Sequence, residues 1–245
     1  MLYANMLHYF VQSSFQLPAI SPMAFLLHKK RKEVEMKQNQ FGRSMIEMLG
    51  VLAIIAVLSV GGIAGYSKAM EKFKVNKAIR EYSYLMQGLL ENLKDLQNVS
   101  KPNEGDVQYG LTSVVKAKNL VPKTWEKVGP IDYDDPYGNR IRIFSRNQAL
   151  VIDMYLGGYQ PVDGGSVSTS FSPKFCSSLM QNVVQPLASV LYKAWFTTIG
   201  NTYFGNDYCN ENRNCIRNIS LNEINSVCNY CTKEVNKLCG LILEF

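Results

Sequence analysis

The sequence predicts an α+β protein in which a long N-terminal helix packs on a small antiparallel sheet, with extra helices and a disulfide-rich C-terminal region. Three observations carry this prediction. Residues 48–67 form an uncharged apolar run, and apolar residues then recur at three- and four-residue steps. Residues 140–144 and 149–156 are typical of two strands joined by a short turn. All six cysteines lie after residue 175.

The apolar run predicts a membrane span. From Met48 to Ser67 there is no charged residue, and a helix of that length rises about 30 Å, the thickness of the hydrocarbon layer. Glu47 stands at the start of this run. An acidic residue at mid-membrane costs roughly 2.5–3.5 kcal/mol, and less toward the interface. A carboxylate in this position therefore needs a compensating partner.

Beyond the span the pattern stays helical to about residue 98, where a turn cluster at 102–105 ends it. The apolar positions of this half are Phe73, Ile79, Tyr82, Met86, Leu89, Leu93 and Leu96. They form a stripe with charged residues on the other side. We expect the stripe to pack against a small globular head.

The head is expected to mix helices and strands. In chain order we expect a short helix over 111–119, strands over 140–144 and 149–156 joined at 145–148, a helix over 174–198, a loop over 201–218, a helix over 220–237 and a last strand over 239–245. Ser172 and Pro173 begin the second long helix as N-cap and first-turn proline, Pro186 bends it, and Gly200 ends it.

Charge and histidine content exclude several function classes. The net charge is +6, part of it in a basic cluster at 29–37, and the remainder is too diffuse to indicate nucleic-acid binding. The only histidines, His8 and His28, precede the apolar run. A chain cut near residue 42 would lack histidine, and with it His-based catalysis and His-ligated metal sites. We expect no enzyme, no cofactor and no metal.

Residues 1–35 do not resemble a fold. They lack a sustained period and end in a basic cluster, whereas a signal peptide carries its basic residues first. Lys32-Glu33-Val34 can be encoded by a purine run that reads as a bacterial ribosome-binding site ahead of Met36. We interpret residues 1–35 as an untranslated upstream stretch, with a cytoplasmic extension as the alternative, and residues 36–42 as a leader.

The short leader with its lysine, Gly42, Glu47 as the fifth residue after that glycine, and the spanning run together resemble the type IV prepilin signature of the type IV pilin and pseudopilin family. The resemblance implies cleavage between Gly42 and Arg43 by a prepilin peptidase and N-methylation of the new amine of Arg43. It also implies that Glu47 neutralises the amine of a neighbouring subunit in a filament. Arg43 departs from the Phe, Met or Leu usual there and adds a second positive charge.

The resemblance also implies a fold, a location and partners. The fold would be that of type IV pilins, with the long helix over 43–100 and a periplasmic or extracellular head over 101–245. The chain would be a single-pass inner-membrane precursor that enters an extracellular pilus (fimbrium) or a periplasmic pseudopilus. Its partners would be identical or related subunits, the peptidase, an assembly platform and membrane lipid. Adhesion, motility, DNA capture and secretion all remain open as roles of such a fibre.

Residues 119–143 are similar to the connecting region of pilins and pseudopilins, in which an Asp-Pro-aromatic-Gly-Asn turn enters the first sheet strand. That turn is Asp135-Pro136-Tyr137-Gly138-Asn139 in this chain. Asp132, Asp134 and Asp135 invite a calcium interpretation, but their spacing differs from the EF-hand pattern. A solvated loop is the favoured interpretation.

The cysteines indicate disulfides in an oxidising compartment, because an even number of them follows a membrane segment. They are Cys176, Cys209, Cys215, Cys228, Cys231 and Cys239. Cys209 and Cys215 can close a small ring. The layout resembles the larger type IVb pilins, which implies a bridge from the Cys176 region to the terminal segment. The pairing stays open, and the Cys228–Cys231 spacing leaves redox and zinc alternatives.

Other interpretations of the N-terminal region remain. Ser44 to Glu47 fits a capping box, in which Glu47 closes its own helix start. The apolar run would also fit a signal peptide cleaved after Ala64, or a plain single-span anchor. The alternative functions are a secretion pseudopilin, a tethered or secreted periplasmic binding protein that does not polymerise, and a thiol oxidoreductase. The cysteine-rich C-terminal third favours a pilus over a pseudopilus.

Overall fold

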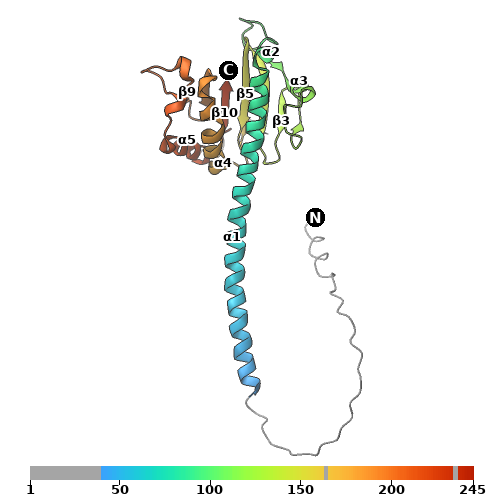
Figure 1. Ribbon diagram of the computed structural model, residues 1–245, viewed down its shortest axis with the longest axis vertical. Helices are drawn as coiled ribbons and strands as arrows, with labels where there is room; N and C mark the ends of the chain where they lie inside the picture. The colour runs from blue at the N-terminus through green and yellow to red at the C-terminus, as the bar shows by residue number, and fades with distance from the viewer. Residues whose placement is uncertain (1–39, 163–164, 234–236) are drawn as a thin grey trace, which may run out of the picture. The chain divides into compact units, whose positions relative to one another are not determined.

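The computed structural model describes residues 40–162, 165–233 and 237–245 (Figure 1). The predicted upstream stretch 1–35 and leader residues 36–39 lie outside the described residues. The chain divides into two compact units, 1–57 and 58–245, and the boundary falls within the first helix. The second unit contains the whole head.

Helix α1 runs over Gln40–Glu91, and its part from Met45 onward is long and apolar enough to cross a membrane. Every residue over 45–69 is exposed, so nothing within the described chain covers this apolar surface. Ser44 lies inside the helix rather than at its start. The capping-box interpretation of Glu47 is therefore wrong for this helix.

The helical pattern was expected to run unbroken to about residue 98, but α1 ends at Glu91. The Asn92 side chain donates a hydrogen bond to the carbonyl of Gly88 (2.9 Å), and a short helix α2 follows over Leu93–Gln97. Asparagine side chains compete for backbone hydrogen bonds in this way, which explains the break.

The head is built on an eight-stranded sheet with the order β2-β3-β4-β5-β10-β8-β9, and β1 pairs with β4. The strands are β1 (Tyr109–Gly110), β2 (Glu126–Lys127), β3 (Asp132–Asp134), β4 (Arg140–Arg146), β5 (Ala149–Tyr155), β8 (Lys193–Phe196), β9 (Thr202–Phe204) and β10 (Gly240–Glu244). All of the pairings between these strands are antiparallel. The last strand in chain order, β10, thus lies between β5 and β8.

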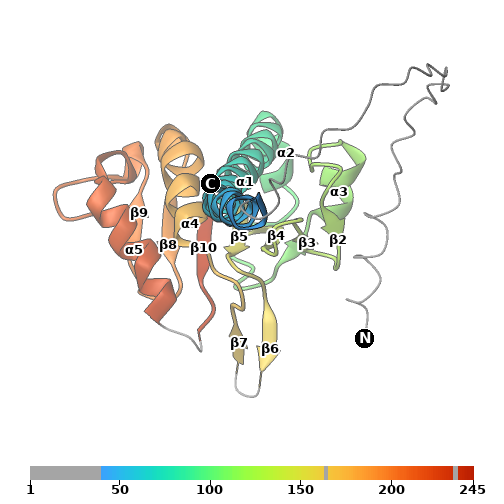
Figure 2. The same ribbon diagram turned by 90° about the horizontal axis from the view of Figure 1, so that it is seen from below.

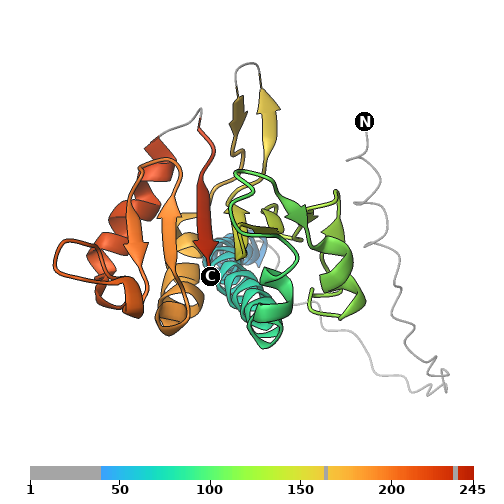
Figure 3. The same ribbon diagram turned by 90° about the horizontal axis from the view of Figure 1, so that it is seen from above.

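The two central strands confirm the predicted hairpin. Asn147 and Gln148 both adopt positive φ (50° and 58°) and form the tight turn between β4 and β5. Positive φ at both central residues suits the twist of a hairpin. A separate two-stranded sheet, β6 (Gln160–Val162) and β7 (Gly165–Val167), extends away from the main sheet, as Figure 3 shows.

The C-terminal half of α1 forms the centre of the core. Tyr82, Leu85 and Leu89 are essentially fully buried and belong to one cluster with the inward residues of β4, β5 and β10. Seen from below, α1 and α4 (Pro173–Leu179) lie on the same face of the sheet (Figure 2). The predicted apolar stripe is therefore confirmed from Ile79 to Leu96 as the face that packs on the head, whereas Phe73, which was expected to belong to it, is 56% exposed.

The predicted helix over 174–198 is only partly correct. Ser172 caps α4 by accepting a hydrogen bond from the amide of Phe175 (3.3 Å), as expected. A π-helical turn η1 (Met180–Val184) and a 3-10 turn η2 (Gln185–Ser189) follow, and residues 193–196 form β8. Pro186 cannot continue an α-helix, and Ala194 and Phe196 point into the core in the alternation of a strand. Gly200 (φ 68°) consequently forms the turn from β8 to β9 instead of ending a helix.

The remaining elements are short. They are α3 (Thr112–Ala117), the 3-10 turns η3 (Asn206–Tyr208) and η4 (Ile216–Asn218), and α5 (Leu221–Lys233). The stretch expected to be loop over 201–218 thus contains β9, η3 and η4. The last predicted strand is confirmed as β10.

Candidate functional site

Gly42, Arg43 and Glu47 all lie within the first turns of α1. The side chain of Glu47 belongs to the exposed part of that helix. The predicted cleavage position therefore lies inside α1, just before the long exposed apolar part of that helix. The roles of Gly42, Arg43 and Glu47 stay predictions.

The turn Asp135–Asn139, which we call the buried turn, is organised around one carboxylate. Oδ1 of Asp135 accepts hydrogen bonds from the amides of Tyr137 (2.9 Å) and Asn139 (2.8 Å). Its Oδ2 accepts from the side-chain amide of Asn139 (2.7 Å). Asp135 is only 6% exposed, so the expectation of a solvated loop is wrong for this residue.

Two other elements are tied to the buried turn. The hydroxyl of Tyr82, on α1, donates to Oδ2 of Asp135 (3.0 Å). The amide of Gly157 donates to the side-chain oxygen of Asn139 (2.8 Å). Gly157 has φ 81°, and a Cβ there would lie 2.5 Å from the amide nitrogen of Phe171, so only glycine fits. The turn thereby connects the long helix to the end of β5.

Burial sets the protonation of this network. Loss of water around Asp135 raises the pKa of its carboxyl, and the hydrogen bonds from Asn139, Tyr137 and Tyr82 offset part of that rise. Burial, and next the neighbouring Asp135, raise the pKa of the Tyr82 hydroxyl well above its usual value. Tyr82 is therefore a hydrogen-bond donor to Asp135 over the physiological pH range.

Two aromatic side chains, Trp125 and Phe175, pack against the ring of Tyr82. Its ring centroid lies 5.0 Å from that of Trp125 in an edge-to-face arrangement and 5.5 Å from that of Phe175. The indole nitrogen of Trp125 donates to Glu81 (3.0 Å). Sequence reasoning identified Tyr82 only as an apolar-stripe residue. The signal that could have revealed a buried acceptor is the polar hydroxyl of Tyr82 at a core position of the helix.

Two of the three carboxylates considered for calcium, Asp132 and Asp134, are paired with arginines. Arg140 makes two hydrogen bonds to Asp134 (2.7 and 2.9 Å), and Nε of Arg142 lies 3.5 Å from Asp132. Within the described part of the chain no three potential ligands come together as a metal group. Asp132 and Asp134 are half-buried on β3 and serve as ion-pair partners.

A buried carboxylate that sequence reasoning missed lies on β5. Asp153 is 6% exposed, accepts a hydrogen bond from Tyr155 (3.3 Å) and lies 3.6 Å from Nη1 of Arg142. Burial raises the pKa of Asp153 to about 6, although the positive charge of Arg142 acts in the opposite direction. The alternation along β5 places it on the sheet face opposite α1.

All six cysteines form disulfides. The pairs are Cys176–Cys228, Cys209–Cys215 and Cys231–Cys239. The first joins α4 to α5, the second closes the small ring considered above, and the third joins the end of α5 to β10. Cys228 and Cys231 are thus bonded to different partners, and the redox and zinc interpretations of their spacing are wrong.

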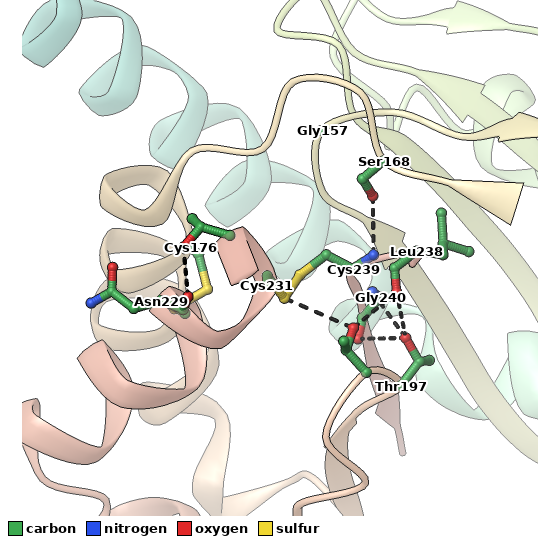
Figure 4. The surroundings of a disulfide bond; sticks show 12 residues. Gly157, Ser168, Cys176, Thr197, Asn229, Cys231, Leu238, Cys239 and Gly240 are labelled. Atoms are coloured by element: carbon green, nitrogen blue, oxygen red, sulfur yellow. Dashed lines mark hydrogen bonds between the residues drawn. A yellow bond between two sulfur atoms is a disulfide. The ribbon is translucent and has the colours of Figure 1, made fainter. Parts of the chain in front are cut away.

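The Cys231–Cys239 bridge sits within a hydrogen-bonded junction (Figure 4). The amide of Cys239 donates to Ser168 (3.0 Å), and the hydroxyl of Thr197 accepts from the amide of Gly240 (3.0 Å). Thr197 also donates to the carbonyl of Leu238 (3.2 Å). The bridge and these bonds fix the entry of β10 into the sheet.

No protein-family model, curated protein or solved structure matches this chain. Its class therefore follows from its own architecture. It is an α+β protein with a long N-terminal helix, an antiparallel sheet, additional helices and three disulfides. This arrangement is compatible with a pilin-like fold.

Proposed function

We propose that the chain is a structural subunit of a type IV pilus-like filament. It is made as a membrane-anchored prepilin, cut after Gly42, and assembled through α1. One observation carries the proposal. α1 is a single helix whose first half exposes an apolar surface while its second half forms the core of a disulfide-bonded head.

The exposed apolar half of α1 has to be buried against lipid or protein. Large side chains such as Ile46, Val57 and Val60 are at least 70% exposed. Burying apolar area stabilises by about 25 cal/mol per Å². Lipid tails provide that cover before assembly, and the same half of neighbouring subunits provides it within a filament.

Glu47 provides the negative charge that would pair with a neighbouring subunit during assembly. A carboxylate moved into an apolar environment is costly unless it meets a cation. Cleavage after Gly42 creates a new amine on Arg43, four residues before Glu47 in the mature chain. In the proposed filament, Glu47 of one subunit meets the amine of its neighbour.

The disulfides support a head outside the cytoplasm, because disulfides persist in oxidising compartments. Cys176 and Cys228 are fully buried, so this bridge forms part of the core.

The test is the mass of the mature N-terminus together with electron microscopy of sheared surface material. The proposal expects a chain that starts at Arg43, in filaments that contain the head. A chain starting at Gly65 would instead indicate a secreted protein, and an uncut chain would indicate a plain anchor. Either of those results would refute the filament proposal.

A further inference from the structure

The five basic residues that directly follow the apolar run form an exposed cluster on α1. This basic segment, 68–80, contains Lys68, Lys72, Lys74, Lys77 and Arg80, and all five are exposed. It lies entirely within the second unit. A dense cation group directly beyond a span can attract an anionic partner.

The carboxylate within this segment, Glu71, and the one directly after it, Glu81, are engaged with the head. Glu71 forms an ion pair with Lys174 at 2.7 Å. Glu81 accepts the indole hydrogen bond of Trp125 at 3.0 Å. Among the described residues, none of the five cations forms an ion pair with a carboxylate. The segment therefore keeps its positive charge available for a partner outside the chain.

Aromatic side chains accompany the cations. Tyr66 is 68% and Phe73 56% exposed. A groove of about 660 Å³ beside α1 is lined by Phe73, Lys77, Arg80, Tyr84 and Lys123, among others. Exposed aromatic rings next to lysine and arginine are typical of the membrane–water interface, where the apolar stem lies in the boundary and the charge reaches the headgroups.

The geometry of the helix matches the headgroup layer. A helix rises 1.5 Å per residue, so Lys72 lies about 6 Å and Lys77 about 14 Å beyond Lys68 along the helix axis. Each polar layer of a bilayer is roughly 5–7 Å deep, and the Debye length is about 8 Å at physiological salt. If residues 48–67 span the bilayer, Lys68 and Lys72 reach the headgroups directly. Lys74 and Lys77 then lie within about a Debye length of them.

We propose that the basic segment binds anionic phospholipid headgroups at the membrane surface from which the head emerges. The positive-inside rule gives cations no role at the non-cytoplasmic end of a span, so orientation does not account for them. This inference rests on the proposed function in taking 48–67 as a span and in placing the head on the non-cytoplasmic side. Contact with acidic lipid would hold the helix exit and head at the surface until assembly.

The test uses the full chain in phosphatidylcholine vesicles that contain spin-labelled phosphatidylglycerol or spin-labelled phosphatidylcholine. Electron paramagnetic resonance measures the fraction of each labelled lipid that the protein immobilises. We expect phosphatidylglycerol to be enriched at the protein about threefold, and the preference to fall toward one in 1 M NaCl, where the Debye length is about 3 Å.

Matched variants locate the effect. Lys72→Gln/Lys74→Gln/Lys77→Gln should abolish most of the preference for phosphatidylglycerol. Any preference that remains should be no larger than the cations on the N-terminal side of the span supply. Lys94→Gln/Lys101→Gln/Lys116→Gln also removes three exposed lysines, but from the rest of the head, and should leave the preference unchanged.

Failure of this inference and failure of the span are distinguishable. Flotation with vesicles after alkaline extraction reports insertion of 48–67, whatever the lipid preference. Inserted protein without a preference, or with a preference that survives the first triple variant, overturns the lipid inference. If the first variant instead abolishes cross-linking between copies while no lipid preference exists, the segment binds an acidic protein face and the lipid inference is wrong.

Discussion

The hydroxyl of Tyr82 on α1 donates a 3.0 Å hydrogen bond to the buried carboxylate of Asp135, fifty-three residues later in the chain. The two residues join the long helix to the turn between β3 and β4. Asp135 receives three further hydrogen bonds, all from within the turn. The contact with Tyr82 is thus the one that sets the helix against the turn.

Replacing Tyr82 by phenylalanine removes this hydrogen bond while keeping the ring. A hydrogen bond to a charged or buried group contributes about 1.5–3 kcal/mol, so Tyr82→Phe should lower the free energy of unfolding by that amount. Denaturant unfolding in detergent micelles, followed by fluorescence of the adjacent Trp125, measures the change.

Tyr84→Phe is the matched control. Its hydroxyl donates to the carbonyl of Asn119 (2.7 Å), but the side chain is 53% exposed. Water can replace that bond, and the loss should stay below about 1 kcal/mol. Equal losses in the two variants would contradict the role assigned to the buried pair.

Gly157→Ala should destabilise the head severely. The position combines φ 81° with a Cβ that would lie 2.5 Å from backbone atoms of Phe171. Gly105→Ala separates the two effects, since Gly105 has φ 67° with open space around it. The left-handed conformation alone costs about 1–2 kcal/mol. We expect a loss of that size at Gly105 and a clearly larger one at Gly157, measured as a shift in Tm; similar shifts would argue against the close approach.

The stability of the head should fall as pH rises from about 4 to 6. Asp153 has a folded-state pKa raised to about 6, so the folded state binds a proton more tightly than the unfolded state. Its stabilising contribution is present below the unfolded pKa of about 3.9 and is lost as pH passes the folded value, by up to about 3 kcal/mol. The raised pKa of Asp135 acts in the same direction.

Asp153→Asn should therefore flatten the pH dependence between pH 4 and 6 relative to the wild-type chain. Asp106→Asn removes an exposed carboxylate that is ion-paired with Arg146, and serves as the control. Unfolding curves of the wild-type chain and both variants at four pH values measure this pH dependence. A variant with the wild-type slope would show that Asp153 titrates normally.

Loss of the Cys176–Cys228 bridge should cost more than loss of the Cys209–Cys215 bridge. The first spans 52 residues of sequence and the second only 6. Loop-closure entropy then predicts about 4 and about 2 kcal/mol. The double alanine variants, compared by denaturant midpoint under non-reducing conditions, give the order. A larger cost for the small ring would contradict the loop-length argument.

Glu47→Leu tests the proposed assembly. The substitution leaves the apolar helix and Gly42 intact, so cleavage should proceed while filament yield falls to background. Glu71→Gln, which changes a carboxylate paired with Lys174 on the same helix, should assemble normally. Filament yield by microscopy and chain mass are the two readouts. Normal filaments from Glu47→Leu would count against a charge pair between subunits.

The sequence predicted the parts of the fold that obey local rules. The apolar stripe of α1, the β4–β5 hairpin, the cap at Ser172 and the last strand all follow from spacing or single-residue chemistry. The helix expected over 174–198 failed at its C-terminal end, where residues 193–196 form β8, because tertiary pairing prevailed over local propensity. Its residues alternate between core and surface and gain a strand partner in β10.

The buried turn was recognised as a turn but not as a junction. An aspartate that begins a turn commonly accepts a hydrogen bond from the amide two residues later, and Tyr137 follows that rule, while Asn139 adds a second amide four residues later. Nothing local reveals that Tyr82 reaches the same carboxylate, or that β5 is followed by a glycine that bonds Asn139. The small Cys209–Cys215 ring was suggested by its short spacing, but the other two disulfides were out of reach because they depend on which elements become neighbours.

The placement of β10 between β5 and β8 has a consequence for how the molecule matures. When Tyr155 has been synthesised, its future partner Gly240 has not, so the β5 edge waits without its neighbour. An unsatisfied strand edge invites pairing with other chains. The interval before the final strand arrives is therefore the time of greatest vulnerability to aggregation, and an oxidising catalyst or a chaperone would have its largest effect then.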